Sequence, residues 1–169
     1  MKAALPISIP GCFFPEGFAG VTSIPMMLLT GSDDLVVPSR GSERSYGIAN
    51  APKYLVILDG VDHLRFADID GTDREFQDAV QAVLASAGVV EDAEKIVDAF
   101  GGGDLSYCVG AEDDGGPLVS GERQRELLRA FATPFFAAYL LGDKDALSFL
   151  QDALPGLVPE ATTFTFEPE

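Results

Sequence analysis

Two continuous apolar runs dominate the first part of the chain. Residues 24–31 (IPMMLLTG) and 53–60 (KYLVILDG) show no alternation of apolar and polar positions, and each ends in a glycine. Such runs are typical of parallel strands that are covered on both faces. Between them we expect a helix over roughly 40–49, with Ser39 as its N-cap. This order predicts an α/β fold with parallel strands and flanking helices.

Helical periodicity dominates the rest of the chain. A helix is expected from Thr72 or Asp73 to about Ser86, and a short one over 91–100. Residues 101–121 form a glycine-rich, acidic loop, and we consider 89–119 as a lid or a flanking insertion.

A long helix is expected over 122–142, which Pro134 either kinks or divides by opening a new helix. Its apolar positions recur at helical spacing and predict a core face: Phe131, Phe135, Tyr139 and Leu140. Another short helix is expected over 144–154.

The two ends of the chain have weaker patterns. Residues 3–10 (AALPISIP) predict a short strand near a sheet edge, because prolines cannot donate to a ladder. Residues 161–169 alternate weakly, which fits either an edge strand or a tail.

Composition limits the classes of protein that fit. With 169 residues, 47% of them hydrophobic, the chain suits a single domain with a real core. The net charge of −16 disfavours binding to nucleic acid or to an anionic membrane surface. No apolar run reaches the roughly 18 residues of a membrane span. Pro6 and Pro10 interrupt the apolar N-terminal stretch, so we do not expect a signal peptide.

Two cysteines leave the cellular compartment open. Cys12 and Cys108 lack metal-site spacing, and both a disulfide and a pair of buried thiols fit them. The location stays unknown: a cytoplasmic one is favoured for the chain as given, and secretion is the alternative if the true N-terminus is missing.

Polar residues that could carry chemistry follow the two apolar runs. Asp33 and Asp34 come after the first run, and His63, the only histidine, comes after the second. Functional residues gather at the carboxyl ends of parallel strands, so we expect these side chains to meet.

These two stretches resemble the C-terminal part of the α/β-hydrolase superfamily. The first reads Gly31, Ser32, Asp33, Asp34 and ends in Pro38, and the second reads Gly60, Val61, Asp62, His63. The order, acid and then histidine, is that of the family. Residues 134–150 (PFFAAYLLGDKDALSFL) also look like the closing helix of dienelactone hydrolase and acetylhydrolase-type esterases.

The resemblance implies a Ser-His-Asp hydrolase that acts on a small carboxylic ester, with no cofactor and no metal. Asp34 matches the family's acid and His63 its base. Asp33 is one residue too early, so it is either a bystander or a second charge that raises the pKa of the histidine.

The family's nucleophile motif, Gly-x-Ser-x-Gly, is missing. Before Asp34 only Ser8, Ser23 and Ser32 are available, and none has both flanking glycines. Ser45 follows the acid and lies in a predicted helix, so we reject it. The chain therefore reads as a partial hydrolase domain over 1–169 that is a fragment, part of a split enzyme or a decayed relative; we favour the fragment. We expect the isolated chain to be inactive and to associate with itself or with the missing N-terminal half.

Two other classes of protein are alternatives to the hydrolase. A non-enzymatic interaction module would leave His63 incidental. A calcium loop over 68–75 (DIDGTDRE) lacks EF-hand spacing, with Phe66 and Gln77 where acids are required. Carboxylates at a helix start explain these aspartates better.

Overall fold

The structure is a computed structural model that describes residues 2–14, 16–21, 24–67, 102–108 and 116–168, with isolated positions 79, 82, 95, 98 and 99. The strands in this part are β1 (Met26–Gly31), β2 (Lys53–Leu58) and β3 (Ala161–Glu167). The longer helices are α1 (Ser39–Ile48) and α4 (Gly121–Leu141). The shorter elements are η1 (Gly11–Phe13), η2 (Leu64–Ala67), η3 (Leu105–Tyr107), α5 (Lys144–Ser148), the π-helical η4 (Phe149–Ala153) and α6 (Leu154–Leu157).

The strands form one mixed sheet in the order β1-β2-β3. β1 and β2 are parallel, in register from Met26 opposite Lys53 to Gly31 opposite Leu58. β3 pairs antiparallel with β2. The predicted α/β class is therefore correct, with the two apolar runs as adjacent parallel strands.

The chain segment near the N-terminus extends this sheet beyond β1. Ala4 and Ile7 form isolated parallel bridges with Met26 and Leu29 rather than a regular strand. Pro6 has no N–H, but its carbonyl accepts a hydrogen bond from the Leu29 N–H at 3.0 Å. At the other side of the sheet, the C-terminal segment forms the edge strand β3. Of the two alternatives for 161–169, an edge strand and a tail, the strand is therefore correct.

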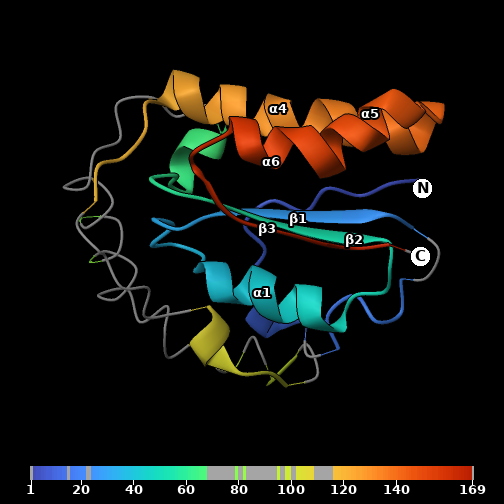
Figure 1. The fold of residues 1–169 in the computed structure, drawn as a ribbon. Helices are drawn as coiled ribbons and strands as arrows, with labels where there is room; N and C mark the ends of the chain where they lie inside the picture. Colours follow the sequence, from blue (N-terminus) through green and yellow to red (C-terminus); the bar gives the residue numbers. More distant parts are fainter. Residues whose placement is uncertain are drawn as a thin grey trace.

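Helices cover both faces of the sheet (Figure 1). Met27 and Leu29 point to one face, where they pack in a cluster with residues of α4, η4 and α6. Met26 and Leu28 point to the opposite face, toward Tyr46 and Ala49 at the end of α1. Alternate side chains of one strand thus enter two apolar layers, which explains why β1 and β2 are buried along their whole length.

The core face of α4 differs in one position from the prediction. Phe131 and Phe135 are fully buried, and Tyr139 packs against the same cluster. Leu140 is 45% exposed, so its assignment to the core was wrong. It follows Phe135 by five residues, which rotates it by about 140° around the helix axis.

Helix boundaries also differ from the expectations. Ser39 is the first residue of α1 rather than its N-cap, which is Pro38, and the Ser39 hydroxyl donates to Glu43 Oε1. Pro134 lies inside a continuous α4 and opens no new helix. The short helix expected over 144–154 is divided into α5, η4 and the beginning of α6.

A disulfide joins Cys12 in η1 to Cys108, directly after η3. The buried thiol pair that the sequence left open is therefore excluded. The helices expected over 72–86 and 91–100 lie outside the described residues except at the isolated positions. The 68–75 segment, considered as a calcium loop, lies outside the described residues as well. The same holds for most of the 89–119 segment, considered as a lid or insertion. Its described residues are 102–108, 116–119 and the isolated positions 95, 98 and 99.

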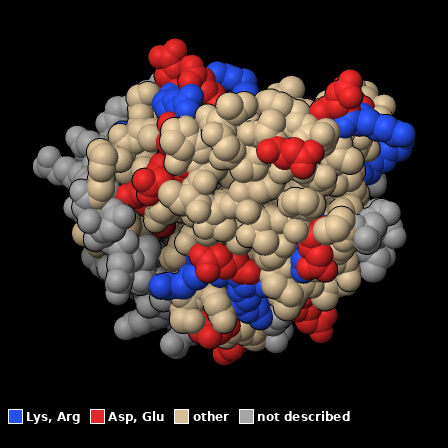
Figure 2. Space-filling model, viewed as in Figure 1, with Lys and Arg blue, Asp and Glu red and all other residues tan. Residues whose placement is uncertain are grey.

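None of the helices in the described part of the chain combines the length and apolar character that crossing a bilayer requires. On the face shown in Figure 2, acidic and basic side chains form small mixed groups separated by uncharged surface.

Candidate active site

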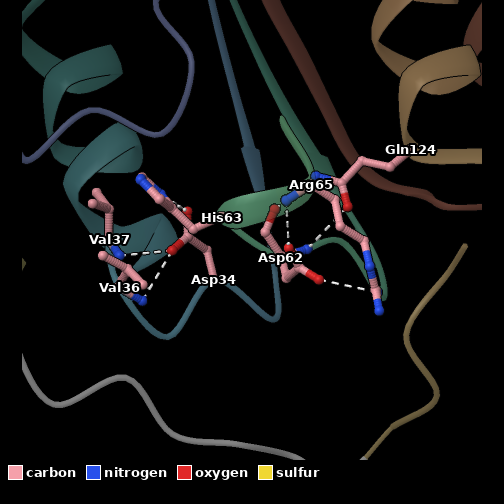
Figure 3. Close-up of polar contacts among 7 residues, drawn as sticks. All are labelled: Asp34, Val36, Val37, Asp62, His63, Arg65 and Gln124. Carbon is pink, nitrogen blue, oxygen red and sulfur yellow. Dashed lines mark hydrogen bonds and ion pairs between the residues drawn. The ribbon is translucent and has the colours of Figure 1, made fainter. Parts of the chain in front are cut away.

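Asp34 and His63 meet at the carboxyl ends of β1 and β2. Asp34 lies three residues after the last residue of β1, and His63 lies five residues after the last residue of β2. His63 Nδ1 is 2.9 Å from Asp34 Oδ2 (Figure 3). The structure thus brings together the two residues that the sequence singled out.

The turn after β1 fixes the carboxylate of Asp34. Its Oδ1 accepts hydrogen bonds from the N–H groups of Val36 (3.0 Å) and Val37 (2.7 Å), while Oδ2 faces the imidazole. The side chain is fully buried. Both oxygens therefore have partners, and the carboxylate presents one defined acceptor to His63.

His63 is held on one side and open on the other. Its side chain is 32% exposed. Within the described part of the chain Nε2 makes no hydrogen bond, so the bond to Asp34 selects the neutral tautomer with a proton on Nδ1. Nε2 is then the nitrogen that can accept a proton from a neighbouring group.

The hydrogen bond to Asp34 raises the pKa of His63 above its ordinary value of 6.5. Burial of the ring opposes this effect, because it disfavours the charged form. The negative charges of Asp34 and Asp62 act in the same direction as the hydrogen bond.

Asp33, which the sequence leaves as a bystander or a second charge, bonds to groups of both turns. Its Oδ2 accepts hydrogen bonds from the Ser32 hydroxyl (2.7 Å) and the Gly60 N–H (3.0 Å). These bonds link the turn after β1 to the turn after β2. The second negative charge that acts on His63 belongs to Asp62.

Both motif glycines are required by close packing of these turns. A Cβ on Gly31 would lie 1.9 Å from the Val61 carbonyl oxygen. Gly60 has a φ of +68°, and a Cβ there would lie 2.7 Å from the Pro117 carbonyl oxygen. Gly31 thus allows the two turns to approach each other closely, and Gly60 allows the turn after β2 to approach the segment that leads into α4.

No serine hydroxyl in the described part of the chain is bonded to His63. Ser8, at the carboxyl end of the segment beside β1, has a φ of +45° and a buried hydroxyl with no hydrogen-bond partner. Ser32 is bonded to Asp33, and Ser45 donates to the Gly41 carbonyl. Ser23 lies outside the described residues.

The described residues contain no group of three or more side chains placed to hold a metal ion.

Sequence reasoning missed the residues that surround the histidine turn. Asp62 is in the quoted motif but received no role, although its spacing to Arg65 is that of a capping aspartate. Gln124 contacts Asp62 from a helix that begins nearly 60 residues later, and no local pattern signals that contact.

Comparisons of the chain with protein-family models, with curated proteins and with solved structures gave no match. The interpretation of this site therefore depends on its own geometry.

Proposed function

We propose that this chain supplies the acid, Asp34, and the general base, His63, of a Ser-His-Asp hydrolase that acts on small carboxylic esters. The observation that carries the proposal is the 2.9 Å contact between His63 Nδ1 and the buried Asp34 carboxylate. The nucleophile belongs to a polypeptide segment outside this chain, because no serine of the chain lies in a Gly-x-Ser-x-Gly motif.

The chemistry follows from the two ring nitrogens. A serine hydroxyl placed near Nε2 loses its proton to that nitrogen as its oxygen attacks the ester carbonyl. The imidazolium then returns the proton to the leaving alcohol, and a water molecule repeats both steps to release the acid. Asp34 keeps the proton on Nδ1 and stabilises the imidazolium.

The proposed lineage is the C-terminal portion of the α/β-hydrolase fold. Three features support it: two parallel strands covered on both faces, an acid and a histidine at adjacent strand ends in that order, and a glycine in each turn. This lineage also explains why the base and its acid occur without a nucleophile.

The test extends the chain with the in-frame coding sequence upstream of Met1, or with a co-expressed neighbouring reading frame, that carries Gly-x-Ser-x-Gly. The joined protein is assayed on short-chain nitrophenyl esters. We expect His63→Ala to lower kcat by about 10⁴-fold or more. Asp34→Asn is expected to lower kcat by about 10⁴-fold, because it removes the acceptor that selects the tautomer.

Asp33→Asn is the matched control. It makes the same change in the adjacent buried residue, whose carboxylate is bonded to Ser32 and Gly60, and its oxygen still accepts from Gly60. We expect kcat within a few fold of the unsubstituted protein. Full activity of the His63→Ala protein, or the absence of a nucleophile motif from both candidate segments, contradicts the proposal.

A second candidate, a non-enzymatic interaction module, has one observation in its favour. Several large apolar side chains of the outer helices are exposed: Leu140, Leu141, Phe149 and Leu157. A joined protein that folds, forms a defined complex and hydrolyses no ester would favour this candidate.

A further inference from the structure

Gln124 in α4 contacts the residue that precedes His63. Its Nε2 donates to the Asp62 carbonyl oxygen at 2.6 Å, and its Oε1 accepts from the Asp62 N–H at 3.3 Å (Figure 3). The Gln124 side chain is fully buried. One amide thus satisfies both main-chain groups of Asp62, a pairing that resembles a single rung of a β-ladder.

Further contacts join the same turn to the segment that leads into α4. The Gly60 carbonyl accepts from the Val119 N–H at 2.8 Å. Arg65 Nη1 donates to the Val119 carbonyl at 2.9 Å and pairs with Asp62 Oδ2 at 3.0 Å. The contacts with Gly60, Asp62 and Arg65 lie on both sides of His63 in the sequence.

These contacts restrict the backbone of the turn that carries the His63 imidazole. His63 lies five residues beyond the end of β2, outside the ladder of the sheet. Asp34, by contrast, is fixed within its own turn by the N–H groups of Val36 and Val37. The histidine side of the pair therefore depends on contacts from another element, because a turn is held by its hydrogen bonds rather than by strand pairing.

We propose that Gln124 is the positioning residue for His63, holding the Asp62 main chain so that Nδ1 meets the Asp34 carboxylate. Its effect on catalysis rests on the proposed function, whereas its effect on the His63–Asp34 contact does not. A side-chain amide suits the Asp62 N–H and carbonyl because it presents one donor and one acceptor in a fixed geometry. A glutamate at 124 keeps an acceptor for the Asp62 N–H, loses the donor to the Asp62 carbonyl and places a charge beside the Asp62 carboxylate.

The test uses the full 169-residue chain and needs no nucleophile. Because His63 is the only histidine, NMR of the ring nitrogens and protons reports on this residue alone. Gln124→Met removes both hydrogen bonds at nearly constant volume. We expect it to weaken the downfield Nδ1–H signal and to move the His63 titration to lower pH. Gln124→Glu keeps one of the two hydrogen bonds, and we expect it to weaken the signal less than Gln124→Met does.

Gln151→Met is the matched control. Gln151, in η4, donates to the Tyr54 hydroxyl at 2.6 Å, within the layer of helices that includes α4 but at a distance in sequence from the histidine turn. We expect it to leave the His63 signals and titration unchanged. Identical His63 signals in Gln124→Met and the unsubstituted chain overturn the proposal, as does an equal change in Gln151→Met.

If Gln124→Met does not fold, the unsubstituted chain still provides a test. The side-chain amide protons of Gln124 must exchange slowly with solvent, and rapid exchange overturns the proposal. In the joined protein, Gln124→Met is expected to lower kcat by up to about 100-fold with little change in KM. A joined protein with no activity at all counts against the proposed function, while the NMR result decides the role of Gln124 separately.

Discussion

The imidazole of His63 lies close to two carboxylates that act on it in different ways. Asp34 is hydrogen-bonded to Nδ1 and so determines both the tautomer and the orientation of the ring. Asp62 acts through its charge, and its own oxygens are engaged by the Arg65 N–H and guanidinium. The direct hydrogen bond is thus the larger cause of the raised pKa.

This difference predicts how the isolated chain responds to pH. The folded state raises the pKa of His63 above 6.5, its ordinary value. The stability that the protonated pair contributes is therefore fully present below pH 6.5 and is lost as the pH rises through the folded pKa. The unsubstituted chain should exceed Asp34→Asn in free energy of unfolding, measured with urea. We expect this difference to shrink as the pH rises from 6.5 through the folded pKa of His63.

NMR titration provides the independent check of that prediction. His63 should titrate above pH 6.5 in the unsubstituted chain and at lower pH in Asp34→Asn. The same titration midpoint in both proteins would show that the hydrogen bond does not control this group. In an active joined protein, kcat/KM should rise with the same midpoint, because the base must be neutral to accept a proton.

At the scale of single elements, α4 has two functions. Its buried face supplies Leu127, Phe131 and Phe135 to the core above the sheet. Its first turn carries Gln124, which reaches the histidine turn. Packing of the helix and placement of the site are therefore coupled through one rigid element.

The two faces of α4 should respond differently to truncation. Phe135 is fully buried and packs edge-on against Tyr54. We expect Phe135→Ala to lower the free energy of unfolding by about 3–5 kcal/mol. Leu141→Ala changes a side chain that is 82% exposed and should cost less than about 0.5 kcal/mol. Similar losses in both variants, by urea unfolding, would contradict the assigned core face.

The disulfide links two short elements that lie next to α1. Cys12 belongs to η1, and Cys108 follows η3, at a sequence separation of 96 residues. Arg40 Nε donates to the Ser106 carbonyl, and the Arg44 guanidinium lies 5.0 Å from the centre of the Tyr107 ring. The crosslink thus reinforces a docking contact between η3 and α1.

Removal of this crosslink should destabilise the chain. The double variant Cys12→Ala and Cys108→Ala is expected to lose about 2–4 kcal/mol of unfolding free energy, because the unfolded chain is no longer constrained. Reducing agent should lower the stability of the unsubstituted chain by a similar amount and leave the double variant unaffected. A reductant effect of equal size in both would mean that it does not act through Cys12 and Cys108.

At the scale of the whole molecule, an exposed sheet edge and the net charge have opposite effects on association between copies of the chain. Within the described strands β3 is the last in order, and most of its side chains are at least partly exposed, including Phe166. An unpaired edge with exposed apolar groups favours association between copies. The net charge of −16 opposes association through repulsion.

We therefore expect association of the isolated chain to increase with salt. Raising the ionic strength from about 0.01 M to about 1 M shortens the screening length from about 30 Å to about 3 Å and so weakens the repulsion. Sedimentation velocity should show larger species at high salt. A monodisperse monomer at both salt concentrations would contradict the prediction of an exposed, associating edge.

The sequence by itself determined the two buried strands and the order of acid and histidine. Unbroken apolar runs specify a strand covered on both faces, and the turns after Gly31 and Gly60 depend on residues within a few positions of each strand end. Tertiary structure alone decided the remaining features. The Cys12–Cys108 pair, the contact of Gln124 with Asp62, and the hydrogen bond of Asp33 with Gly60 all join segments that are distant in sequence. Such contacts arise from the packing of elements against each other, and they leave no periodic signal in the chain.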